Sequence, residues 1–386
     1  MGAMSGGMRE RVVRPSSTEE VQQAVREVPR LIPRGGGTKW GTAGLPEEDD
    51  LVVLDTTGLT GIVEYDPAEF TVTARAGTRL ADLERLLADH DQYLPFDPLL
   101  VDAGATLGGT VATGVSGACR LRFGGVRDFV LGLTFVDGNG RVARGGGRVV
   151  KNAAGYDLPK LFCGSQGRFG VITELTLKVF PRPQAFGTIC FPFDGVGEAA
   201  AAVRSLFRSP LEPHALELAG PGVDGPHYTL FVRIGGPAAS LAAWLDRVEG
   251  VVGRRGRRLP AGSEEEATLW RRFRELEWAA GGVALLRLYA RPTSIEVLDR
   301  LLARYEAMRV FSQAGSAAWA LFPDEPDWES LAAALAAAGA SALCWRGGPP
   351  GITHLVPPAG VRIARAVKGV FDPEGRFPPL GWKGPA

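Results

Sequence analysis

Residues 31–39 read Leu-Ile-Pro-Arg-Gly-Gly-Gly-Thr-Lys, a short extended run that leads into three successive glycines. Consecutive glycines allow neighbouring backbone N–H groups to point at one place, which makes a nest for an anion such as a pyrophosphate. The hydroxyl of Thr38 and the ammonium group of Lys39 add possible donors. Taken alone, this stretch fits a mobile surface loop equally well.

Further glycine clusters follow at 104–125, 137–147 and 164–170, all in the first half of the chain. Gly108-Gly109 stands at the start of a predicted short helix, whose free N–H groups suit a phosphate or a ring carbonyl. The cluster at 164–170 runs into an apolar strand. Asp137 to Gly140 reads instead as a hairpin turn. Separate clusters of this kind predict a long dinucleotide rather than a mononucleotide.

Other classes of protein are excluded or disfavoured. No G-x-x-x-x-G-K-[ST] motif occurs, which excludes a P-loop, and no G-x-G-x-x-G opens a helix in a βαβ unit, which disfavours a Rossmann domain. Lys and Arg total 43 and so do Asp and Glu, a balance that argues against nucleic-acid binding. The four cysteines form no C-x-x-C pair, so zinc and iron–sulfur sites within the chain are not expected.

The sequence also leads to expectations about where in the cell the protein is located. No apolar run is long enough to span a membrane, and the first ten residues have no apolar core of the kind that signal peptides need. We therefore expect a cytoplasmic protein with reduced thiols, or one held peripherally at the inner face of the membrane by its partners. Residues 1–8 read as a disordered tail.

Four ordered runs make the chain recognisable: RGGGTK at 34–39, ATLGGTVATGVSG at 105–117, LRFGGVRDFVLGLTFVDGNG at 121–140 and KNAAGYDLPKLFCGSQGRFGVITELTLKVFPRP at 151–183. They resemble the flavin domain of the vanillyl-alcohol oxidase family, also called the para-cresol methylhydroxylase type. The tail VKGVFDPEGRFPP at 367–379 resembles the closing run of that family. Within the family, the resemblance is greatest to the smaller FAD-binding subunits of bacterial glycolate oxidases.

The resemblance implies an α+β protein with FAD as its cofactor. A two-part FAD-binding domain of the para-cresol methylhydroxylase type is expected at 9–185. An α+β cap domain with a mainly antiparallel sheet is expected at 186–356, and a C-terminal segment at 357–386 that returns to the first domain. The strand–helix–strand pattern occurs about twice in the cap, which hints at an internal repeat. The predicted helices there include 293–308, and the predicted strands include 341–346.

The resemblance also implies the residues that bind FAD. They are Pro33, Arg34, Gly35, Gly36, Gly37, Thr38, Lys39, Trp40, Pro98, Ala105, Thr106, Leu107, Gly108, Gly109, Ala112, Thr113, Gly117, Val171 and Ile172. The first loop would hold the pyrophosphate, and the C-terminal run Phe371-Asp372-Pro373 would return near the flavin ring.

Three departures from the family pattern matter. The first loop has Gly37-Thr38 where some relatives carry a histidine that bonds to the flavin, so we expect a non-covalent FAD. Gly114 stands where the family often has asparagine. The closing run has Arg376-Phe377-Pro378-Pro379 in place of an ending in Asn-Pro-Gly, so an asparagine that would face the flavin is missing.

Catalytic residues are not identified by any strong pattern. Oxidation of a 2-hydroxy acid needs a base for the hydroxyl proton and a cation for the carboxylate. The chain has only four histidines, in no metal-binding arrangement, so we predict no metal site. His354 is a candidate base, and Arg287 with Tyr289 could hold a carboxylate. Each also fits an ordinary structural or surface position.

The function implied by the resemblance is that of an FAD-binding oxidoreductase subunit in a complex that oxidises glycolate or a similar short 2-hydroxy acid. The implied partners are a larger FAD-binding subunit and an iron–sulfur subunit. Two alternatives stay open: a stand-alone FAD-dependent alcohol or hydroxy-acid dehydrogenase, and a non-catalytic structural subunit that retains the flavin fold.

Overall fold

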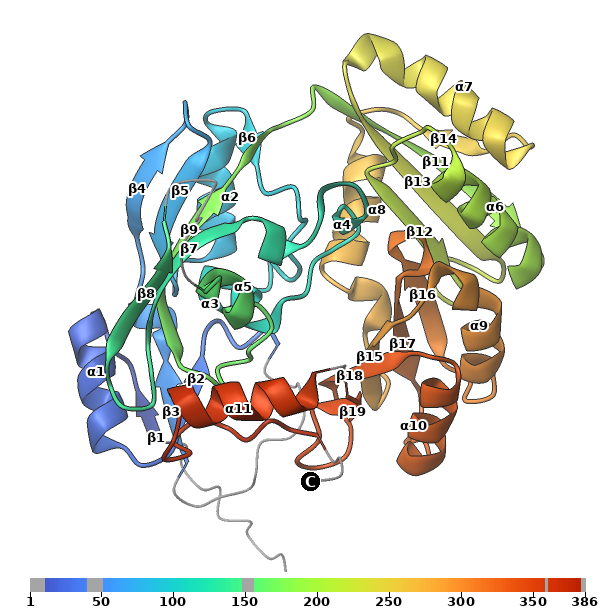
Figure 1. The fold of residues 1–386 in the computed structure, drawn as a ribbon. Coiled ribbons are helices and arrows are strands. Elements are labelled where there is room, and N and C mark those ends of the chain that lie inside the picture. Colours follow the sequence, from blue (N-terminus) through green and yellow to red (C-terminus); the bar gives the residue numbers. More distant parts are fainter. Residues whose placement is uncertain (1–10, 40–50, 148–155, 358–359, 383–386) are drawn as a thin grey trace, which may run out of the picture.

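The computed structural model describes residues 11–39, 51–147, 156–357 and 360–382. Figure 1 shows two bodies side by side, with the C-terminal helix α11 (Val361–Phe371) running beneath the first body towards the second. The first body holds the glycine segments, and the second is built on one large sheet. Trp40 lies outside the described residues, as do residues 1–8.

The first body contains two main sheets, as expected for a two-part domain, and a short antiparallel pair of β6 (Gln92–Tyr93) and β10 (Phe180–Pro181). The smaller sheet has the order β1-β3-β2 and is parallel throughout. Its strands are β1 (Arg11–Val13), β2 (Leu31–Arg34) and β3 (Val52–Asp55), and helix α1 (Thr18–Glu27) packs on them. The side chain of Ser17 caps α1 by accepting from the backbone N–H of Glu20.

The larger sheet is antiparallel and has the order β4-β5-β9-β7-β8. Its strands are β4 (Ile62–Asp66), β5 (Thr71–Arg75), β7 (Val130–Val136), β8 (Val142–Gly146) and β9 (Val171–Lys178). Helices α2 (Leu80–Ala88), α3 (Leu107–Thr113) and α5 (Leu158–Phe162) contribute to the core above it. Asp137 to Gly140 forms the predicted hairpin turn between β7 and β8, with the Asp137 carboxylate accepting from the N–H groups of Asn139 and Arg141.

The second body is a nine-stranded antiparallel sheet with the order β14-β11-β13-β12-β16-β17-β15-β18-β19. The strands are β11 (Ala185–Phe193), β12 (Ala215–Ala219), β13 (Tyr228–Gly236), β14 (Arg257–Leu259), β15 (Ala284–Tyr289), β16 (Met308–Ser312), β17 (Ala317–Phe322), β18 (Ser341–Arg346) and β19 (His354–Val356). Four helices connect them: α6 (Val196–Arg208), α7 (Leu241–Val252), α9 (Ile295–Ala303) and α10 (Trp328–Ala337).

The chain runs twice through the same β-α-β-β-α-β sequence in this sheet, from β11 to β14 and again from β15 to β18. Both halves have the spatial strand order fourth, first, third, second, and they join where β12 pairs with β16. This arrangement confirms the internal repeat that the strand–helix–strand pattern hinted at. It is the split βαβ arrangement used twice.

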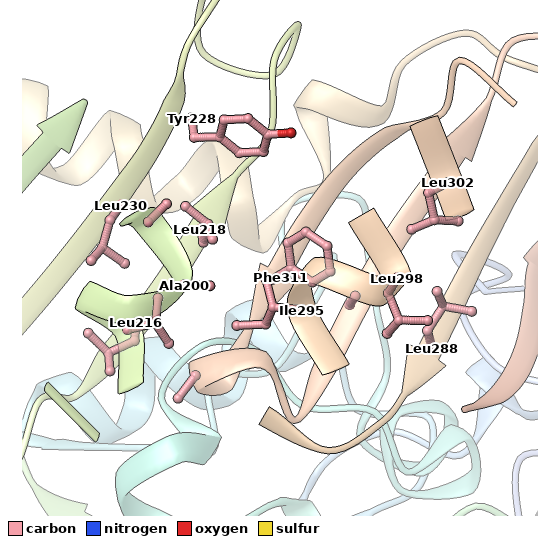
Figure 2. Close-up of a cluster of buried hydrophobic side chains, with 14 of the residues drawn as sticks. Ala200, Leu216, Leu218, Tyr228, Leu230, Leu288, Ile295, Leu298, Leu302 and Phe311 are labelled. Atoms are coloured by element: carbon pink, nitrogen blue, oxygen red, sulfur yellow. The ribbon is translucent and has the colours of Figure 1, made fainter. Parts of the chain in front are cut away.

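The two faces of the cap sheet pack against different partners. The outer face is covered by α6, α7, α9 and α10, and leucines from the strands fill the layer between them, as Figure 2 shows for Leu216, Leu218, Leu230 and Leu288. The inner face packs against α8 (Glu264–Arg274) and against Leu99, Val115 and Ala118 of the first body. Because side chains alternate along a strand, each strand serves both layers.

The C-terminal segment ties the two bodies together. The N–H of Gly138 donates to the carbonyl of Phe371 at 2.7 Å, and the N–H of Thr353 in the cap donates to the carbonyl of Gly381 at 2.6 Å. The segment therefore returns to the first body, as expected. The predicted division at residues 185–186 falls where β11 begins, and we retain it as a proposal.

One predicted element of the cap is wrong. The helix predicted over 293–308 ends at Ala303, and the chain then enters strand β16. Glu306 has a φ of 53°, which breaks the helix and turns the chain back onto the sheet. The short strand β14 was not predicted either.

A substitution of Leu298 on α9 tests how much the packing of the outer layer stabilises the cap. The Leu298 side chain is 1% exposed and belongs to the core cluster, whereas Val297 beside it is 46% exposed. We expect Leu298→Ala to lower the free energy of unfolding by about 2–5 kcal/mol and Val297→Ala to change it by less than about 0.5 kcal/mol. Denaturant unfolding of both variants measures this; equal effects would contradict the assigned packing.

Candidate functional site

A pocket opens where β2 ends, and segments far apart in the chain converge on it. It spans about 970 Å³ of non-atom space, a figure that includes open solvent. Its lining is Ile32, Pro33, Arg34, Gly35, Gly36, Gly37, Thr38, Lys39, Thr56, Thr106, Gly108, Gly109, Ala112, Thr113, Gln166, Gly167, Arg168, Gly170, Val171, Ile172 and Pro378. A second, shallower hollow adjoins it across Gly35 to Gly37 and Thr106, so the site is elongated.

Close backbone packing explains the glycines of the first loop. A Cβ atom on Gly36 would lie 2.0 Å from the carbonyl oxygen of Gly104, and one on Gly35 would lie 2.2 Å from the hydroxyl of Thr106. Any side chain at either position would push the first loop away from the second glycine segment. Gly37 has a φ of 69°, which favours glycine for a different reason.

The hydrogen-bond donors of the pocket come from the first loop and not from helix α3. Within the described residues, no protein acceptor meets the backbone N–H groups of Gly36, Gly37 or Thr38. The expectation that α3 offers free N–H groups at its start is wrong. The first N–H groups of α3 already donate within the protein: Leu107 to Thr78, Gly108 to Ala76 and Gly109 to the Thr106 side chain.

The charge of the pocket favours a polyanion. Three cationic side chains, Arg34, Lys39 and Arg168, belong to the lining, and no aspartate or glutamate of the described residues does. Burial lowers the pKa of Arg168 to about 10 and that of Lys39 to about 8, in the second case against the opposing effect of the Glu275 carboxylate. The Lys39 ammonium lies 3.4 Å from the carbonyl of Leu99 and 3.5 Å from the Thr110 hydroxyl. Burial of a cation is costly, and a bound anion would offset part of that cost.

Most of the predicted cofactor residues line this pocket, and four of the described ones do not. Ala105 and Leu107 are buried behind it and support the second segment. Pro98 and Gly117 lie outside the lining. A Cβ on Gly117 would meet the carboxylate of Asp97 at 2.4 Å, so this glycine serves packing at the domain interface. The prediction for Trp40 lies outside the described residues.

Sequence reasoning missed several residues of the pocket. Thr56, Gln166, Arg168 and Pro378 all belong to its lining. Arg168 is held by the carbonyl of Pro379 at 2.6 Å and by the hydroxyl of Thr353. A cation within the cluster of glycines at 164–170 was the available signal for Arg168. Pro378, rather than the predicted Phe371-Asp372-Pro373 run, brings the C-terminal segment to the pocket.

A second cavity lies between the inner face of the cap sheet and the first body; we call it the interdomain cavity. It encloses about 300 Å³ of empty space and is lined by Asp97, Leu99, Ser116, Gly117, Ala118, Glu217, Phe273, Arg274, Trp278, Arg287, Ser312 and Trp319. Leu99 lines this cavity, while its carbonyl touches the Lys39 ammonium that lines the first pocket. The two sites therefore share a wall.

The three candidate catalytic residues do not all lie in one place in the structure. Arg287 is 1% exposed and lines the interdomain cavity, which excludes the alternative of an exposed strand face. Tyr289 lies beside it, with the guanidinium carbon of Arg287 5.8 Å from the tyrosine ring. His354 lies on the edge strand β19, where the register places Leu343 between it and Arg287. Burial, with the charge of Arg168, lowers the pKa of His354 to about 4, so its ring is neutral at pH 7.

Comparison with known proteins bears on the first body. A family model described as an FAD binding domain matches residues 10–146. The pocket fits this cofactor on its own chemistry, since three cations and unpaired N–H groups face a space with no acid, beside apolar walls from Val171 and Ile172.

Curated relatives and a solved structure extend the comparison. The chain is 44% identical over 167 residues to glycolate oxidase subunit GlcE of Escherichia coli and 31% identical over 251 residues to glycolate oxidase subunit GlcD of Bacillus subtilis. These matches cover 43% and 63% of this chain. The D-lactate dehydrogenase of Anaerostipes hadrus is 34% identical over 211 residues, which cover 53% of this chain and 44% of that protein. The chain is thus related to FAD-linked oxidoreductases, as predicted.

The matched part spans about half the length of these relatives, 47% of GlcE and 52% of GlcD. A solved structure of alkyldihydroxyacetonephosphate synthase aligns with a TM-score of 0.71 at 17% identity, over 96% of this chain and 75% of that one. This likeness concerns the fold alone, and it confirms the predicted α+β architecture with its FAD-binding domain and cap.

The described residues contain no helix with both the length and the apolar composition needed to cross a bilayer. They also contain no group of three or more histidine, cysteine or acidic side chains that could share a metal ion. All four cysteines are described and are free thiols.

Gly36 tests the close contact between the first two glycine segments. We expect Gly36→Ala to reduce FAD affinity at least about tenfold, because its methyl group would meet the Gly104 carbonyl and displace the loop. Gly197→Ala, at an open position in α6 with nothing near the added carbon, is the control and should keep the wild-type flavin content. Flavin absorbance per protein after gel filtration measures the difference. A variant at Gly36 that stays fully yellow would refute the contact.

The lowered pKa of Lys39 predicts that the affinity for the cofactor depends on pH. In the free protein this lysine loses its proton near pH 8, and a bound pyrophosphate favours the charged form. FAD affinity should therefore fall as the pH rises from about 8 to about 9.5, where the free protein binds fewer protons than the complex. Lys39→Met should bind more weakly and without this slope, whereas Arg34→Met should bind more weakly but keep it, since a guanidinium stays charged. Fluorescence titration of the apoprotein with FAD measures all three; a slope that survives in Lys39→Met would contradict the assignment.

Proposed function

We propose that this chain is an FAD-binding subunit of an enzyme complex that oxidises a short 2-hydroxy acid such as glycolate, and that its flavin is bound without a covalent link. One observation carries the proposal: a cationic pocket suited to FAD shares a wall with a cavity that holds a buried arginine. The names of the GlcE and GlcD relatives support glycolate as the substrate.

Different residues of the first pocket would bind different parts of the cofactor. The N–H groups of Gly36, Gly37 and Thr38 would bind the pyrophosphate together with the nearby cations. Thr106 and Ala112 from the second segment, with Val171 and Ile172, would pack against the rings; the predicted residues Pro98 and Gly117 would act from outside the lining. No histidine, cysteine or tyrosine of the described residues lines the pocket, which supports a non-covalent flavin.

The residues of the interdomain cavity would hold the substrate. When bound, FAD supplies the chemistry of hydride acceptance. Arg287 would bind the substrate carboxylate through charged hydrogen bonds, because a guanidinium matches a carboxylate geometrically. Trp319 stacks on the guanidinium at 4.5 Å and fixes its orientation. His354 lies outside this cavity, which favours a proton acceptor elsewhere in the complex.

The proposed partners are a larger FAD-binding subunit and an iron–sulfur subunit, with the assembly in the cytoplasm or peripheral at the inner face of the membrane. The chain would then pass electrons or support assembly through its own FAD. A stand-alone dehydrogenase remains the second candidate, favoured by the closeness of Arg287 to the first pocket. A non-catalytic scaffold is the third, and the preserved cation set of the pocket argues against it.

A visible spectrum with and without glycolate tests the proposal. We expect the purified chain to be yellow and to keep its flavin oxidised when glycolate is added alone, but to have it bleached within the assembled complex. Bleaching of the isolated chain would favour the stand-alone dehydrogenase, and a colourless chain that still binds its partners would favour the scaffold.

The role of this flavin within the complex needs a separate measurement. A complex rebuilt with the Gly36→Ala chain should lose most of its glycolate:acceptor activity if electrons pass through this FAD. The Gly197→Ala chain serves as the assembled control. Full activity with the flavin-free chain would remove the electron-transfer role and leave a role in assembly.

A further inference from the structure

Three side chains that line the interdomain cavity carry a buried N–H group with no hydrogen-bond acceptor among the described residues. They are the Nε of Arg287, the indole Nε1 of Trp278 and the Nε of Arg274, which lies 3.5 Å from the Glu275 carboxylate. Such groups are rare in folded proteins because each costs about 1–3 kcal/mol when left unpaired. Their convergence on one cavity indicates a small ligand with acceptor oxygens.

The cavity also contains an acid that is coupled to this arginine. The hydroxyl of Ser312 donates to the carboxylate of Glu217 at 2.5 Å and lies 3.4 Å from a terminal nitrogen of Arg287. The N–H of Gln313 donates to the other carboxylate oxygen at 3.1 Å. Burial raises the pKa of Glu217 to about 7, so this group can change its charge near neutral pH.

Other charged or titratable groups face Glu217 from each side. Asp97 of the first body, whose carboxylate accepts from the N–H of Ala118, has a pKa raised mainly by burial. Cys119 is a buried thiol with a raised pKa and does not ionise near neutral pH. Arg287 is the cation nearest to Glu217, and Tyr289 lies beside Arg287. Glu217 is therefore the group with the closest link to the arginine and a pKa near 7.

Backbone geometry sets this region apart from the rest of the protein. Nine non-glycine residues have a positive φ within the described part of the chain. Five of them belong to the segments that enclose the cavity: Asp97, Leu100, Leu276, Gln313 and Ala314. Residues in this conformation cost free energy and cluster at sites where function requires a fixed geometry.

We infer that a carboxylate bound by Arg287 and Trp278 in this cavity draws one proton onto Glu217, with Ser312 linking the acid to the arginine. The bound anion places a second negative charge beside the Glu217 carboxylate, and protonation of Glu217 relieves the repulsion. Glu217 acts here as a positioning residue. The inference rests on the proposed function only for the identity of the carboxylate, and its test requires no oxidation.

The test uses acetate, a two-carbon carboxylate with no hydroxyl group to oxidise, and the FAD-loaded full chain. Calorimetry in two buffers of different ionisation enthalpy should show uptake of up to one proton per acetate between pH 7 and pH 8. The acetate dissociation constant should rise with pH in this range, by up to about tenfold per pH unit. Tryptophan fluorescence, which reports on Trp278 and Trp319, gives an independent titration.

Variants separate Glu217 from its neighbours. Glu217→Gln keeps the size of the side chain and should bind acetate with no proton uptake and no pH slope. Asp97→Asn removes the other acid of the cavity and should keep both the proton uptake and the pH slope. Ser312→Ala removes a hydrogen bond that favours the ionised acid, so the window of proton uptake should move to higher pH. Glu198→Gln, on the exposed side of α6, is the control for loss of a carboxylate elsewhere.

Several outcomes would overturn the inference. Acetate that does not bind, or that binds without proton uptake, contradicts it directly. Loss of the pH slope in Asp97→Asn with its retention in Glu217→Gln assigns the proton to the other acid and also overturns it. If Glu217→Gln does not fold, the shift expected in Ser312→Ala decides instead. Reduction of the flavin by glycolate in the complex is measured separately, so a failure here is distinguishable from a failure of the proposed function.

Discussion

The contact between the first and second glycine segments is the constraint on which the flavin site depends. Gly35 and Gly36 lie against Thr106 and Gly104 with no space for a Cβ atom, so the two segments form one continuous wall. The first segment is the end of a parallel sheet and the second leads into a helix over an antiparallel sheet. This contact therefore joins the two parts of the domain at the place where the first segment presents its free N–H groups.

The cap reaches this site through the alternation of side chains in its sheet. On β15, Leu286 and Leu288 face the outer helices, while Arg287 faces inward. The same alternation on β12 and β16 turns Glu217 and Ser312 inward. The outer layer is mainly apolar, apart from the buried group of Tyr228, Asp299 and Arg309, and the inner face carries buried charges at the domain interface. Duplication of the half-sheet provides enough strands for one continuous inner face.

The sequence predicted the parts of the structure that depend on local chemistry. Glycine clusters, the hairpin at 137–140 and the cap of α1 are readable because the residues act on their own backbone or on near neighbours. The buried role of Arg168 was not readable, since its partner Pro379 is 211 residues away. Strand β14 has three residues, two of them arginines, and forms only because β11 offers an edge. Glu217 lies in the apolar run Ala-Leu-Glu-Leu-Ala, which indicates a buried acid. The sequence alone does not show what that acid contacts.

The wall shared by the two sites makes them responsive to one another. Lys39 reaches the carbonyl of Leu99, whose side chain borders the interdomain cavity. On the other side, Gln313 of the cap donates to the carbonyls of Ser116 and Gly117, just beyond the end of α3. Any movement of the cap that alters the interdomain cavity therefore pulls on the segment that also lines the flavin pocket. Burial shifts the pKa of Lys39 to about 8 and that of Glu217 to about 7, so each of the two neighbouring sites contains a group whose charge responds to an anion bound beside it.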